Sequence, residues 1–119
     1  MNILTSLKKL FQDSDTCSPE ELHSMLQGSE SVFLLDVRRV DELEKARIDG
    51  AMHIPLHALE ERVEELEPWR NAEIVVMCHH GVRSRMAQQF LHERGFEGVR
   101  NLAGGIAAYA NVDPSVGKY

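Results

Sequence analysis

The stretch of the chain best suited to chemistry is a hexapeptide that begins with a cysteine, Cys78-His79-His80-Gly81-Val82-Arg83. It follows the apolar run of residues 74–77 and precedes a helical pattern, so we expect the thiol where a strand turns into the N-terminus of a helix. Backbone N–H groups are unpaired at such a turn and the helix dipole favours negative charge there, which lowers the pKa of a thiol. Arg83 and Arg85 favour the thiolate in the same way. These residues predict that Cys78 is a nucleophile.

Short apolar runs mark the strands that would position this cysteine. Residues 32–37 form a run without alternation, which is typical of a strand buried on both faces. The other expected strands are residues 51–54, 73–77 and 99–102. Parallel sheets are built from strands of this kind.

Helical spacing lies between the strands. Ser18, Pro19 and Glu21 form a capping signal for a helix that Gly28 is expected to end. Residues 41–47 are a polar candidate helix. The apolar residues of a further helix, up to Pro68, are Leu56, Leu59, Val63 and Leu66. After the cysteine loop, the expected inward stripe is Met86, Ala87, Phe90 and Leu91, with Gly95 as C-cap. A last helical turn runs from Gly104-Gly105 through Tyr109.

The alternation of strands and helices predicts one α/β domain with a central, mainly parallel sheet flanked by helices. Ligands bind such sheets at the carboxyl ends of the strands, which is where Cys78 lies. Asp36 and Arg38 follow the first long strand. We expect them to form a polar network that supports the site from behind, orienting groups rather than reacting.

Composition and charge limit the possible functions. The chain has 119 residues, of which 43% are hydrophobic and 27% charged, as suits a single compact domain. Its formal charge of −6 argues against a nucleic-acid binder, which needs a basic face. The densest acidic segment is interpreted as a solvated helix face; its members are Glu60, Glu61, Glu64, Glu65 and Glu67.

Cysteine usage and the first residues predict a cytoplasmic location. Two cysteines, Cys17 and Cys78, are too few for a disulfide framework and favour a reducing compartment. Cys17 is interpreted as an idle, partly buried thiol, with a resolving role toward Cys78 as the alternative. Residues 1–12 lack the apolar core of a leader, and no window is long enough to span a membrane. Residues 1–15 are expected to form an amphipathic helix that packs on the domain or docks on a membrane surface or partner.

A set of ordered motifs extends beyond the cysteine loop. They are Asp36-Val37-Arg38, Glu42, Ile48-Asp49-Gly50-Ala51, Ile54-Pro55, Cys78-x-x-Gly81-x-Arg83-Ser84 and Leu102-x-Gly104-Gly105. In order and spacing they resemble those of single-domain rhodaneses, a family of thiosulfate sulfurtransferases. The resemblance covers residues 16–119 and implies a three-layer rhodanese domain preceded by the extension of residues 1–15. The chain departs from the family's framework motifs at Leu43, Ala46-Arg47 and Tyr109, but not in the cysteine loop.

The closing residues carry a second, fainter resemblance. Val112-Asp113-Pro114 and Tyr119 are similar to the end of rhodanese domains fused to enzymes that activate ubiquitin-like sulfur carriers. This similarity points toward the delivery of sulfur for cofactor synthesis.

The resemblance implies a sulfurtransferase in which Cys78 is the catalytic residue. Its thiolate takes the outer sulfur of thiosulfate or a related donor, sulfite leaves, and a cysteine persulfide remains. Cyanide, a small thiol or a protein cysteine then accepts the sulfur. The expected substrate-binding residues are His79, His80, Gly81, Val82, Arg83 and Ser84. No cofactor is implied, and the cysteines and histidines do not have the spacing of a metal site.

Separate roles are expected within this loop. Arg83 is the candidate for binding the donor's sulfonate oxygens, because a guanidinium presents forked donors. Gly81 lets the loop turn sharply and admits a ligand close to the main chain. Ser84 is expected to cap the next helix. His79 and His80 either add charge or contact substrate, or they are ordinary solvent-facing loop residues.

Three other functions remain open at this point. Dual-specificity phosphatases and arsenate reductases use a similar loop cysteine, but a phosphate cradle of that type has five residues between cysteine and arginine, whereas this chain has four. We therefore expect little phosphatase activity. A non-catalytic rhodanese-like binding module commonly lacks the cysteine that this chain keeps. A persulfide carrier would show slow reaction with thiosulfate beside fast transfer from a protein persulfide. Local motifs leave the donor, the acceptor and the oligomeric state open.

Overall fold

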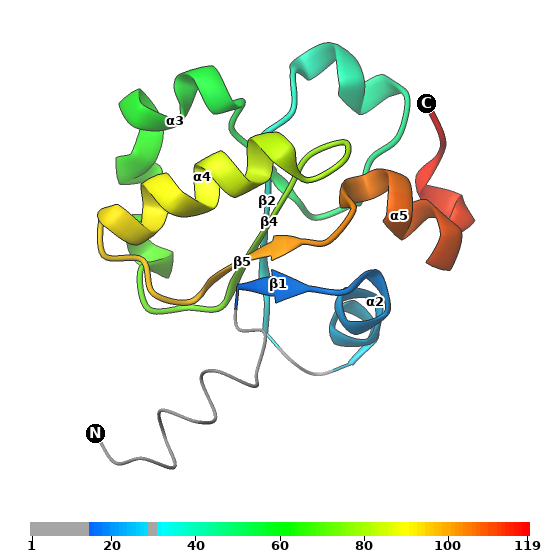
Figure 1. The fold of residues 1–119 in the computed structure, drawn as a ribbon, viewed down its shortest axis with the longest axis horizontal. Helices are drawn as coiled ribbons and strands as arrows, with labels where there is room; N and C mark the ends of the chain where they lie inside the picture. Colours follow the sequence, from blue (N-terminus) through cyan, green and yellow to red (C-terminus); the bar gives the residue numbers. More distant parts are fainter. Residues whose placement is uncertain (1–14, 29–30) are drawn as a thin grey trace.

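The sheet forms the centre of the molecule. The structure, a computed structural model, describes residues 15–28 and 31–119, so nearly all of the predicted amphipathic segment 1–15 lies outside it. All pairings in the five-stranded sheet are parallel, in the order β1-β5-β4-β2-β3 (Figure 1). The strands are β1 (Thr16–Cys17), β2 (Phe33–Asp36), β3 (Met52–His53), β4 (Ile74–Met77) and β5 (Val99–Leu102). The predicted parallel sheet is confirmed.

Helices cover both faces of this sheet. The α-helices are α2 (Pro19–Gln27), α3 (Leu56–Arg62), α4 (Val82–Glu93) and α5 (Gly105–Val112). Shorter 3-10 helices are η1 (Val40–Glu44), η2 (Val63–Trp69) and η3 (Pro114–Val116). Figure 1 shows α3 and α4 on one side and α2 and α5 on the other, which confirms the three-layer α/β architecture. Within the described ranges, no helix has the length and apolar character needed to cross a membrane.

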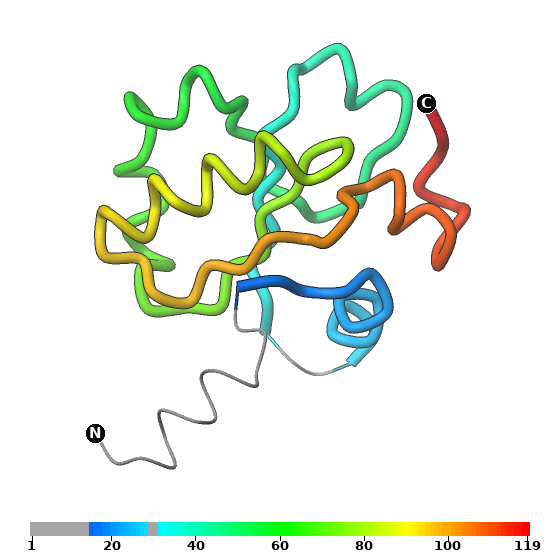
Figure 2. Tube along the Cα trace, in the orientation of Figure 1, coloured from blue at the N-terminus to red at the C-terminus, as the bar shows by residue number. Residues whose placement is uncertain are grey.

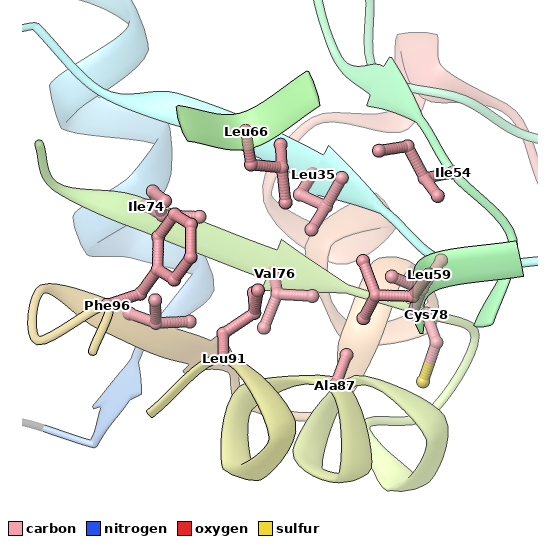
Figure 3. Close-up of a cluster of buried hydrophobic side chains, with 12 residues drawn as sticks. Leu35, Ile54, Leu59, Leu66, Ile74, Val76, Cys78, Ala87, Leu91 and Phe96 are labelled. Carbon is pink, nitrogen blue, oxygen red and sulfur yellow. The ribbon is translucent and has the colours of Figure 1, made fainter. Parts of the chain in front are cut away.

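Two hydrophobic clusters separate the layers. Alternate residues of β4 face opposite sides, so that Ile74 and Val76 pack toward α3 and α4, while Val75 and Met77 pack toward α2 and α5. Cys78 continues the alternation of Ile74 and Val76, and Figure 3 shows it at one end of their cluster, with its sulfur beside α4. Each fully buried aliphatic side chain of these clusters contributes about 1.5–3 kcal/mol to folding.

Local signals account for the ends of α2 and α4. The hydroxyl of Ser18 accepts the Glu21 N–H at 3.0 Å, and the Gly28 N–H closes the helix on the Ser24 carbonyl, as predicted. Gly95, the predicted C-cap of α4, lies one residue beyond the cap residue Arg94 and has the positive φ of 89° that suits a glycine.

The inward face of α4 differs from the prediction at one position. Met86 is 58% exposed, whereas Ala87 and Leu91 are buried as predicted, together with the polar residues Ser84 and Gln88. Polar side chains occupy this face because each finds a partner: the Gln88 amide, for example, donates to the carbonyl of Val99 at 3.1 Å.

The helix predicted up to Pro68 is divided in the structure. Its α-helical part ends at Arg62, and the chain continues in the tighter geometry of η2, which includes Pro68. A proline lacks the N–H that an α-helix would use there. The glutamates predicted to form a solvated face are all exposed; they are Glu60, Glu61, Glu64, Glu65 and Glu67.

The start of α5 lies against the loop that follows β4. The Ile106 N–H donates to the carbonyl of Cys78 at 2.9 Å, and the Ala107 N–H donates to the carbonyl of His79 at 3.1 Å. Gly105 allows this approach, since a Cβ on it would lie 2.3 Å from the oxygen of His79. Its φ of +65° also favours glycine. The N-terminus of α5 thereby fixes the two peptide groups that follow the Cα atom of Cys78.

We expect Gly105→Ala to lower the free energy of unfolding by more than about 3 kcal/mol, because it adds a backbone clash to the conformational strain. Gly50→Ala is the matched control: φ is +88° there, but nothing lies within 4 Å of the added Cβ. The control should cost only about 1–2 kcal/mol. Denaturant unfolding of both variants measures the difference, and equal costs would contradict a close approach at Gly105.

Candidate active site

The sulfur of Cys78 lies in a tight turn between β4 and α4. The side chain is only 1% exposed, and the N–H of Gly81 donates to Sγ at 3.0 Å. Gly81 has a φ of 106°, so the chain reverses here in a conformation that other residues rarely adopt. The predicted strand-to-helix turn is therefore present, with its backbone curled around the thiol.

Ser84 does not cap α4, contrary to the prediction. The N-cap is Gly81, without a side-chain cap bond, and Ser84 is the third residue of the helix. Its side chain is buried and points back to the loop, with Oγ 3.3 Å from Cys78 Sγ and 2.5 Å from Asn101 Oδ1. A hydroxyl has a single proton, so Ser84 donates either to the sulfur or to Asn101 at any moment.

These donors determine the state of the sulfur. Burial raises the pKa of the Cys78 thiol, but hydrogen bonds from the Ser84 hydroxyl and from the N–H groups of Ser84, Gly81 and His80 outweigh it, and the pKa is lowered overall. Arg83 also interacts with the thiolate, since that charge contributes to the raised pKa of its guanidinium. Direct hydrogen bonds nevertheless lower the pKa of Cys78 more than the charges of Arg83 and Arg85 do.

Cys17 has the opposite environment. It is fully buried in the cluster on the α2 and α5 side of the sheet, whereas Cys78 belongs to the cluster on the other side. Burial raises the pKa of Cys17 to about 11. Cys17 is therefore a protonated core thiol, which matches the idle role rather than the resolving one.

Arg83 is paired with Glu42. Its Nη1 lies 2.6 Å from Oε1 and its Nη2 lies 2.9 Å from Oε2, a forked ion pair between the start of α4 and η1. The pairing with Arg83 holds the pKa of Glu42 well below its usual range despite burial. The Arg83 side chain is 29% exposed, and three of its five N–H donors are not used by Glu42.

A second ion pair lies behind the loop. Asp36 and Arg38 form a buried salt bridge of 2.8 Å at the end of β2. Arg38 also donates to the carbonyls of Ala46 and Glu42 and to the hydroxyl of Tyr119. The structure thus places Arg38 against Glu42, the residue that holds Arg83, and Asp36 holds Arg38.

The remaining loop residues lie on the outer side. His79 stacks against Tyr119 with ring centroids 3.5 Å apart, and His80 lies against His79 at 3.8 Å. Burial and the neighbouring His80 lower the pKa of His79, which favours its neutral form. Val82 is 72% exposed. Among the described residues, no three His, Cys, Asp or Glu side chains are grouped so that they could hold a metal ion.

Two residues of the site had no role in the sequence analysis. Asn101 accepts from Ser84 and donates to the carbonyl of Gly81 at 3.1 Å, which joins the loop to β5. An asparagine inside the expected strand of residues 99–102 was the available signal. Tyr119 was noted only as part of a motif, and its contacts with Arg38 and Glu42 depend on the tertiary fold.

We expect Ser84→Ala to raise the pKa of Cys78 by about one pH unit, because it removes a donor to the thiolate. The rate of alkylation by iodoacetamide as a function of pH measures this pKa. At neutral pH the variant should react more slowly, since less thiolate is present. Ser24→Ala, on the exposed side of α2, serves as the control. An unchanged pKa in Ser84→Ala would show that the backbone donors alone set the thiolate.

Two relatives of known name are similar to this chain in sequence, and both names refer to sulfur chemistry. The "Sulfurtransferase" of Allochromatium vinosum is 34% identical over 91 residues, which are 76% of this chain and 83% of that protein. The Bacillus subtilis protein named "Putative sulfur carrier protein YrkF" is 42% identical over 89 residues, 75% of this chain and 47% of that protein, so the match spans about half of this relative.

A solved structure and a family model also match this chain. The crystal structure of a rhodanese-related protein from Thermoplasma volcanium superimposes with a TM-score of 0.74 at 28% identity, covering 83% of this chain and 93% of that chain. The family model described as the rhodanese-like domain matches residues 18–112. The resemblance found in the sequence motifs is thereby confirmed, and the chain belongs to the rhodanese-like domain family.

Proposed function

We propose that the protein is a sulfurtransferase that moves a sulfane sulfur through a persulfide on Cys78. The observation that carries this proposal is the buried sulfur of Cys78, with a lowered pKa and donors from Gly81 and Ser84 directed at it. Such donors stabilise the negative charge of a thiolate. After the first step they stabilise, in the same way, the negative charge of the persulfide that replaces the thiolate. The names of the relatives from Allochromatium and Bacillus support the same chemistry.

The reaction consists of two displacements at sulfur. The Cys78 thiolate attacks the outer sulfur of thiosulfate, a new S–S bond forms, the original S–S bond breaks, and sulfite leaves with the electron pair. An acceptor nucleophile then attacks the terminal sulfur of the persulfide, which restores the thiolate. The acceptor is cyanide in an assay, and a thiol or protein cysteine is the corresponding biological nucleophile.

Arg83 is the proposed contact for the donor. Three of its N–H groups are not used by Glu42, and a guanidinium binds the oxygens of a sulfonate in a forked geometry. The exposed side chains of His80 and Val82 lie at the outer side of the same loop, where a larger donor or acceptor would approach.

A persulfide carrier is the second candidate, favoured by the name of the Bacillus subtilis relative. A carrier would receive sulfur from a protein persulfide and react slowly with thiosulfate. Comparing the rates of Cys78 persulfidation by thiosulfate and by a cysteine desulfurase loaded with sulfur distinguishes the two functions. Faster reaction with thiosulfate favours the enzyme, and faster reaction with the desulfurase favours the carrier.

The proposed persulfide is tested by intact mass after exposure to thiosulfate. We expect one added sulfur atom, about 32 Da, that a reductant removes. Cys78→Ser should abolish the adduct, and Cys17→Ser, the matched control at the buried thiol, should retain it. Absence of the adduct with thiosulfate, polysulfide and a desulfurase alike would refute the sulfurtransferase and leave a non-catalytic binding module.

A further inference from the structure

Tyr119 connects the ion pairs around the loop. Its hydroxyl lies 2.7 Å from Arg38 Nη1 and 2.8 Å from Glu42 Oε2. A guanidinium can only donate hydrogen bonds, so the Tyr119 hydroxyl accepts a hydrogen bond from Arg38 and donates one to Glu42. Figure 2 shows why this is possible: the last residues of the chain run beside the segment around η1, where the Arg47 N–H donates to the carbonyl of Val116 at 2.8 Å.

The Tyr119 hydroxyl shares its carboxylate with Arg83. Oε2 of Glu42 accepts from both Tyr119 and Arg83 Nη2, while Oε1 accepts from Arg83 Nη1 and from the N–H of Arg39. Each donor takes up part of the negative charge of Glu42. The hydrogen bond from Tyr119, which itself accepts from Arg38, offsets part of the negative charge of Glu42. Glu42 then neutralises less of the positive charge of Arg83, and Arg83 attracts another anion more strongly.

We propose that Tyr119 is a positioning residue for anionic sulfur donors, which acts through Glu42 to keep Arg83 available to an anion approaching Cys78. Its hydroxyl bonds to Glu42 and its ring stacks on His79, next to the nucleophile. The inference rests on the proposed function in one respect, that the donor is an anion such as thiosulfate. It adds a residue that lies outside the cysteine loop and that sets the preference for charged donors.

Two alkylating reagents measure this preference without any sulfur transfer. Iodoacetate and iodoacetamide react with a thiolate in the same way: an S–C bond forms, the C–I bond breaks, and iodide leaves. They have similar size, but only iodoacetate is an anion. The ratio of their rate constants at Cys78 therefore reports how strongly the site attracts an anion, and changes in the thiolate fraction cancel. Intact mass counts the adducts, and we expect a single one, because burial raises the pKa of Cys17 to about 11 while the pKa of Cys78 is lowered.

The test compares the wild type with Tyr119→Phe, which keeps the ring on His79 and removes only the hydroxyl. We expect the ratio of iodoacetate to iodoacetamide rates to fall about threefold, with the iodoacetamide rate nearly unchanged. For thiosulfate, KM should rise by a similar factor while kcat stays nearly constant. The matched control is Tyr109→Phe, which removes the hydroxyl 3.2 Å from His23 on the α2 and α5 side and should leave the ratio unchanged.

A second variant shows whether Tyr119 acts through Glu42. Glu42→Gln removes the carboxylate charge, so the ratio should rise, and adding Tyr119→Phe to it should have no further effect. An unchanged or higher ratio in Tyr119→Phe alone, or a full effect that persists in the Glu42→Gln background, would overturn the proposal. If the ratio falls as expected but thiosulfate leaves no persulfide, the proposed function fails while the role of Tyr119 stands.

Discussion

A buried sulfur can carry negative charge only if fixed donors replace the water that it has lost. Cys78 is almost inaccessible, and the uncompensated burial of an ion costs several kcal/mol. The Gly81 N–H and the Ser84 hydroxyl provide that compensation at short range. The rest of the structure around the loop serves to hold these donors in place, because a donor that turns away leaves an ordinary thiol with a raised pKa.

The donors are held by parts of the chain that are distant in sequence. Asn101 on β5 joins the Gly81 carbonyl to the Ser84 hydroxyl, and α5 binds the carbonyl groups of Cys78 and His79. Farther from the sulfur than these donors, Arg83 forms an ion pair with Glu42, which compensates part of its positive charge. The field that an approaching anion meets thus depends on how these pairs are arranged as well as on the net charge of −6.

Sequence patterns predicted the elements well, and the contacts between them less well. The strand of residues 99–102 and the caps of α2 depend on neighbours in sequence, and both were predicted correctly. Ser84 was misassigned because its position in a helical pattern fits a cap, whereas its burial depends on Asn101, seventeen residues away. The pairing of Arg83 with Glu42 joins residues 41 apart, which only the parallel sheet brings together. Met86 was expected inside because an apolar residue at helical spacing usually is.

The opposite environments of the two cysteines mean that unfolding removes the difference between their reactivities. In the native protein, hydrogen bonds lower the pKa of Cys78, whereas burial in the core raises the pKa of Cys17 to about 11. When the chain unfolds, both return to the ordinary pKa of a free cysteine, near 8.5. Cys17 then becomes accessible for the first time, and Cys78 loses the donors that activate it. Modification of Cys17 therefore marks the unfolded molecule, while a difference between the two thiols marks the folded one.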